Sequence, residues 1–86
     1  MDAQVVRERT GENPAWAVNA APPDYGRIAT IEQREGFLYI EPVLRGPCAT
    51  MLARPYTDLR EAMQAIGTHI GGTCEEYRSR PGTVAP

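Results

Sequence analysis

Lysine is absent from the chain, so all nine basic residues are arginines, set against eleven acidic residues for a net charge of −2. A complete lack of lysine is typical of a protein encoded by a GC-rich bacterial genome. Acidic and basic residues are interspersed, as at Arg7-Glu8-Arg9 and Arg34-Glu35. Proteins that bind nucleic acid usually carry a basic patch that displaces counterions from phosphates. The composition disfavours nucleic acid as a partner. The remaining alternative is nucleic-acid binding through arginines that folding would collect on one surface.

Long hydrophobic runs are also lacking. No run approaches the roughly 18 apolar residues of a transmembrane helix. Residues 1–7 have neither the basic start nor the apolar stretch of a signal peptide. We therefore expect a cytoplasmic protein with no membrane partner. A chain of 86 residues has room for one core, and so small a domain gains stability from a cross-link or a second subunit.

Residues that commonly carry chemistry are scarce. His69 is the single histidine, and Cys48 and Cys74 are the two cysteines. A cysteine nucleophile needs a base to generate its thiolate, and nothing in the sequence orients His69 for that role. The cysteines also lack the paired spacing of a structural zinc site. The sequence predicts no catalytic residue, no metal and no cofactor. A cysteine-based redox or hydrolytic enzyme is the alternative hypothesis.

The two cysteines pose a question about a disulfide. A strand of about seven residues advances roughly 23 Å, and a helix from Asp58 to about Gly72 covers roughly 22 Å. A helix lying antiparallel to the strand before it would bring Cys74 back to the level of Cys48. Two alternatives remain open: free thiols, as a reducing cytoplasm favours, or a disulfide worth about 3.5 kcal/mol in the chain-entropy model.

Prolines interrupt the first part of the chain. Pro22 and Pro23 forbid a regular helix or central strand, so residues 1–26 are expected to form an N-terminal arm that is partly ordered around Trp16. Val5 and Val6 could add a fourth, edge strand to the sheet. At the other end, residues 79–86 have little to pack against, and we expect a disordered tail.

The remaining residues, 27–78, predict a compact α+β domain in which a three-stranded antiparallel sheet packs on one C-terminal amphipathic helix. Residues 27–33 and 37–44 are rich in β-branched and aromatic side chains and predict a hairpin, and residues 48–54 predict a third strand. A helical face then follows, with Asp58 and Thr57 competing for the N-cap. Its apolar members recur at helical spacing: Leu59, Ala62, Met63, Ile66 and Ile70. The helix is expected to stop at Gly71 and Gly72, which follow directly.

The second strand of the predicted hairpin is apolar on both faces, because Phe37, Tyr39 and Val43 alternate with other apolar residues. One helix can cover only one face of a sheet, so something else should cover the second. The N-terminal arm with Trp16, a second copy, an unknown protein partner or a small molecule are the candidates. We therefore expect a non-enzymatic interaction or structural module that acts through this face.

The start of the predicted helix carries a resemblance. Residues 56–62, Tyr-Thr-Asp-Leu-Arg-Glu-Ala, follow the predicted strands with a T-x-L-x-E-A segment. This arrangement is similar to that of many small uncharacterised bacterial proteins of β-β-β-α order, over residues 27–72. The resemblance implies a packing helix after the sheet, and it implies no active site.

Overall fold

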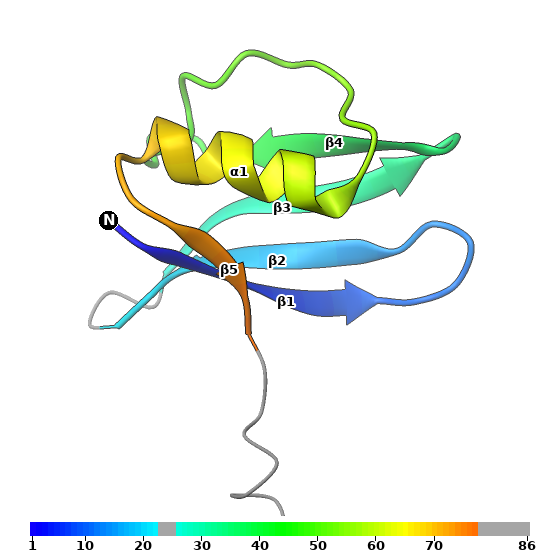
Figure 1. Cartoon of the computed structure of the whole chain (residues 1–86), viewed down its shortest axis with the longest axis horizontal. Helices are drawn as coiled ribbons and strands as arrows, with labels where there is room; N and C mark the ends of the chain where they lie inside the picture. Colours follow the sequence, from blue (N-terminus) through cyan, green and yellow to red (C-terminus); the bar gives the residue numbers. More distant parts are fainter. Residues whose placement is uncertain (23–25, 78–86) are drawn as a thin grey trace, which may run out of the picture.

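A computed structural model describes residues 1–22 and 26–77, which form one small α+β unit (Figure 1). The elements, in chain order, are β1 (Ala3–Arg9), β2 (Ala15–Ala20), β3 (Arg27–Arg34), β4 (Phe37–Pro42), α1 (Leu59–His69) and β5 (Cys74–Glu76). The five strands make one sheet in the order β4-β3-β2-β1-β5. β1 to β4 pair antiparallel with their neighbours, and β5 runs parallel to β1. The predicted α+β class is confirmed, with a mixed sheet of five strands.

The predicted hairpin is confirmed as β3 and β4. Arg34 pairs with Phe37, so that Glu35 and Gly36 alone form the turn. Both turn residues have positive φ, 51° and 86°. A two-residue turn with positive φ at both positions matches the right-handed twist of the strands that it joins.

The N-terminal residues form part of the sheet, where an arm was predicted. β1 pairs with β2 along its length, and β2 pairs with β3 in the middle of the sheet. β2 is buried almost throughout, and Trp16 is only 6% exposed. Its alanine-rich sequence has low intrinsic strand propensity, and burial between two neighbouring strands decides its conformation. The compact unit therefore begins at Ala3.

The strand predicted at residues 48–54 does not form. This segment consists of turns and an irregular stretch, and only Tyr56 makes a bridge, to Leu38. The adjacent apolar residues Met51 and Leu52 break the alternation that a half-buried strand needs, and Pro47 and Pro55 flank the segment. Cys48 is nevertheless fully buried in the core.

Helix α1 begins and ends as predicted. The Asp58 carboxylate accepts a hydrogen bond from the Glu61 N–H at 2.8 Å, which makes Asp58 the N-cap. At the other end Gly71 has a φ of 70°, and Gly72 N–H donates to the Gly67 carbonyl at 2.9 Å. This left-handed termination frees the chain to turn back. It leads directly into β5, which the sequence did not predict.

The core lies between α1 and one face of the sheet (Figure 1). A β-bulge in the β2–β3 pairing lies beside Ile28 and Ala29, and both side chains are buried in the core. No helix among residues 1–22 and 26–77 is long and apolar enough to cross a membrane. The tail predicted at residues 79–86 lies outside the described residues.

Candidate functional site

The two edges of the sheet differ in what covers them. At the β4 edge, Leu38 and Tyr56 exchange backbone hydrogen bonds of 2.8 Å in both directions. Pro42, further along β4, has no N–H to offer an added strand. This edge is therefore closed over part of its length by the chain itself.

The β5 edge has no strand on its outer side in the part of the chain that the structure describes. Thr73 accepts from the Ala3 N–H, and Tyr77 donates to the Val5 carbonyl, each at 2.8 Å. Backbone groups alternate in direction along a strand. The N–H and carbonyl groups of the odd-numbered residues therefore point toward β1, and those of Cys74 and Glu76 point away from it. Gly67 of α1 lies against the Cys74 N–H, since a Cβ at Gly67 would come within 3.2 Å of that nitrogen. Within residues 1–22 and 26–77, the Cys74 carbonyl and the N–H and carbonyl of Glu76 have no hydrogen-bond partner.

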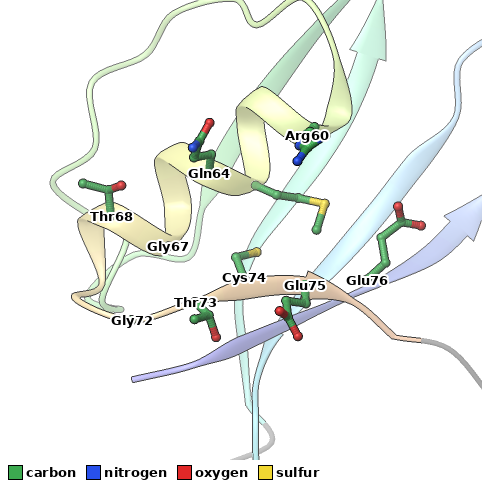
Figure 2. A pocket seen from close by; sticks show the side chains of 10 residues that line it. Arg60, Gln64, Gly67, Thr68, Gly72, Thr73, Cys74, Glu75 and Glu76 are labelled. Carbon is green, nitrogen blue, oxygen red and sulfur yellow. The ribbon is translucent and has the colours of Figure 1, made fainter.

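A groove of about 640 Å³ runs beside this edge, between α1 and β5 (Figure 2). We call it the α1–β5 groove. Two helical rows, Arg60-Gln64-Thr68 and Met63-Gly67, line one wall, and residues 72–76 line the other. Cys74 lies on the α1 side of β5 and Glu75 on the opposite side, as the pairing of Cys74 with buried Ala3 requires.

The N-terminus holds β5 in position. The Asp2 carboxylate accepts hydrogen bonds from the N–H and the hydroxyl of Thr73, at 3.0 and 2.9 Å. These bonds lower the pKa of Asp2, because they favour its charged form. Gly72 allows the close approach, since a Cβ there would meet the Met1 carbonyl oxygen at 1.8 Å. Two segments from opposite ends of the chain are thus fixed side by side.

Charge distinguishes β5 from the other strands. Every glutamate in β1 to β4 has an arginine partner: Glu8 pairs with Arg27, Glu32 with Arg9 and Arg34, and Glu41 with Arg34. Within the part of the chain that the structure describes, neither Glu75 nor Glu76 forms an ion pair. Arg60, across the groove, has none there either. The α1–β5 groove therefore presents charges that have no ion-pair partner among the described residues.

The residues predicted to form an apolar interaction face do not all lie together. Phe37 and Tyr39 lie on the open face of the sheet, whereas Trp16 is buried on the α1 side beneath the Arg7 guanidinium. Val43 follows β4 and is partly exposed. The open face carries the strand ion pairs described above, and Arg34 stacks on Tyr39 at 5.4 Å. The open face therefore carries charged groups beside its aromatic ones.

Both cysteines are free thiols in the structure. Burial raises the pKa of Cys48. Burial, and then the charges of Cys48 and Glu75, raise the pKa of Cys74 to about 11. Activated cysteine nucleophiles have lowered pKa values, so both shifts run against that chemistry. The His69 ring lies 3.0 Å from the Thr50 hydroxyl at the far end of α1.

A second groove, of about 540 Å³, lies on the other flank of α1, beside the loop that contains Thr50 and Leu52. His69 lines one part, and Arg54, stacked on Tyr56 at 4.3 Å and paired with Glu61, lines another. Its charged groups are already paired with each other. No group of three or more metal-ligating side chains occurs among residues 1–22 and 26–77.

Family models, curated proteins and solved structures were compared with the chain, and none matches. The resemblance to small β-β-β-α proteins stays a prediction. Sequence reasoning missed the groove because its strand wall, β5, is only three residues long. The available signal was the polar row Arg60, Gln64 and Thr68 at helical spacing, which is hard to tell from an ordinary solvated face.

Proposed function

We propose that the protein is a non-enzymatic interaction module that binds an extended segment of another protein by strand addition to β5. The observation that carries the proposal is the combination of a free strand edge and a groove of about 640 Å³ beside it. Strand addition uses backbone hydrogen bonds for affinity and a neighbouring groove for side-chain selection. The α1–β5 groove offers both elements in one place.

The difference between the two edges supports this choice. Natural sheets protect their edges with proline, short strands, charge or covering loops. At β4, Pro42 and the bridge to Tyr56 provide such protection. At β5 the strand is only three residues long and carries two glutamates, and the backbone groups of Glu76 have no partner among the described residues. A charged edge repels a like-charged strand and admits an oppositely charged one.

A display experiment tests the proposal. A library of random peptides would be selected against the full chain and, in parallel, against a Glu76→Pro variant. Proline at position 76 removes the outward N–H and leaves the β1 bonds of Thr73 and Tyr77 in place. We expect peptides that bind the native chain and lose binding in the variant, and whose NMR shift changes fall on residues 60–68 and 73–77.

Two controls accompany the selection. Emission of Trp16, the single tryptophan, should stay unchanged in Glu76→Pro if the fold is intact, because that side chain is buried. Methylation of alternate peptide amides should abolish binding in one register only. Strand addition at β5 would be refuted by peptides that bind the native chain and the folded variant equally. It would also be refuted by peptides that change the NMR shifts of the groove beside His69 instead.

A further inference from the structure

The α1–β5 groove has features that restrict which segment it would accept, provided that the proposed function holds. Side chains of adjacent strands lie on the same face where they are paired. A residue added beside Glu75 would therefore place its side chain on the open face of the sheet. Its two neighbours along the added strand would point toward α1. The two faces of the incoming strand thus meet different surroundings.

On the open face, the incoming side chain meets the Glu75 carboxylate. Glu75 has no ion-pair partner within the described residues, in contrast to the strand glutamates Glu8, Glu32 and Glu41. Opposite charges at paired positions stabilise a sheet and like charges destabilise it. A lysine or arginine is the favoured side chain at this position.

On the α1 side, an incoming side chain beside Cys74 meets the wall formed by Met63 and Gly67, whereas Arg60 and Glu76 line the groove further along. Gly67 presents no side chain, and Met63 is a flexible apolar one that adapts to different shapes. An aliphatic side chain gains burial here, whereas a charged one would lose hydration.

A second copy of this chain is a poor occupant. If two β5 strands paired antiparallel about Glu75, the two Glu75 carboxylates would lie directly opposite each other. Each Glu76 would also approach the acidic edge of the other copy. This like-charge pairing is unfavourable, so the edge selects against self-association.

We infer that the groove takes an extended segment of a partner protein in which basic residues alternate with aliphatic ones, the basic side chains on the Glu75 face and the aliphatic ones toward α1. The alternation of period 2 separates this ligand from a merely basic peptide. The resulting recognition is weak in hydrogen bonds, because β5 offers only the free groups of Cys74 and Glu76, and it draws its selectivity from charge and side-chain pattern.

Defined peptides test this inference on the isotope-labelled full chain. The probes are three capped octapeptides: one alternates lysine with valine, one alternates glutamate with valine, and one has the first composition in two blocks. We expect the alternating lysine peptide to change the NMR shifts of residues 73–77. The glutamate peptide should bind about tenfold more weakly, because favourable and unfavourable cross-strand charge pairs differ by about that factor.

The Glu75→Lys variant should reverse the order of affinity of the two alternating peptides. Glu12→Lys, at an exposed position with the same change of net charge, should leave that order unchanged. Added salt should reduce the difference in affinity between the two alternating peptides, because it screens the charges. Three results would overturn the inference and leave strand addition standing. They are equal affinity of the two alternating peptides at β5, equal affinity of the block peptide and the alternating lysine peptide, and an unchanged order of affinity in Glu75→Lys. Failure of the display experiment to enrich any peptide overturns strand addition itself.

Discussion

At the scale of single residues, the Asp58 carboxylate sets the start of α1. It bonds the Glu61 N–H at 2.8 Å, while the neighbouring Thr57 hydroxyl donates to the Glu61 carboxylate at 2.6 Å. The first contact satisfies a backbone donor that the helix cannot use itself. The second joins two exposed side chains and leaves the helix backbone as it was.

Replacement of the two residues should separate these roles. Asp58→Ala should lower the free energy of unfolding by about 1 kcal/mol, and Asp58→Asn should cost much less, because asparagine also caps. Thr57→Ala should stay within about 0.5 kcal/mol of the native chain. Denaturant unfolding followed by Trp16 fluorescence measures all three. A larger loss in Thr57→Ala than in Asp58→Ala would contradict the assignment of the cap.

Cys74 makes stability depend on pH in the alkaline range. Its folded pKa is about 11, whereas an unfolded cysteine titrates near 8.5. Between these values the unfolded chain has lost the proton and the folded chain has kept it. The contribution of Cys74 is therefore complete below about pH 8.5 and is lost as pH rises toward 11.

The comparison of native protein with Cys74→Ala isolates this effect from that of the tyrosines, which both proteins share. The native chain should lose more stability than the variant between pH 8.5 and 11, in denaturant unfolding at fixed ionic strength. Alkylation of Cys74 at pH 8, located by mass spectrometry, should also be slower in the folded chain than in denaturant. Parallel pH profiles of the two proteins would show that the thiol is not perturbed.

At the scale of elements, the sequence was informative where local chemistry decides the conformation. The β3–β4 hairpin follows from two β-rich runs and a glycine in the turn, and α1 follows from its apolar face, its N-cap and the glycines after Ile70. Each of these signals lies within a few residues of the element that it defines.

The elements that were missed depend on partners far away in the chain. β2 is a strand because β1 and β3 lie on both sides of it, although alanines make up half of its six residues. β5 exists because the turn after α1 directs it to β1, where Asp2 holds Thr73. Conversely, residues 48–54 have the composition of a strand but do not pair with β4, where Tyr56 already occupies part of the edge. Long-range pairing of this kind leaves little trace in one sequence.

The candidate site was harder to predict than the fold for the same reason. Arg60 and Glu76 come together only after the chain reverses at Gly71. The predicted interaction residues were chosen from the alternation in β4 alone. That alternation holds, with Leu38 buried toward α1 and Phe37 exposed on the other face. The polar residues that β1 and β2 add to the open face could not be foreseen while residues 1–26 were taken as an arm.

At the scale of the whole molecule, the sheet has one closed edge and one open edge. Tyr56 and Pro42 limit pairing at β4, and ion pairs on the open face join β1 to β3 and β3 to β4. The open edge lies where the two ends of the described chain meet, at Asp2 and β5. A partner strand added at β5 would extend the sheet without rearrangement of the core.

Amide hydrogen exchange, measured residue by residue on the full chain, tests the central claim most directly. In the free protein the Glu76 N–H should exchange much faster than the amides of Ala3 and Tyr77, which bond Thr73 and Val5. A peptide selected against the native chain should then slow the Glu76 amide. A Glu76 amide already as protected as its neighbours in the free protein, or one still fast with peptide bound, would contradict strand addition at this edge.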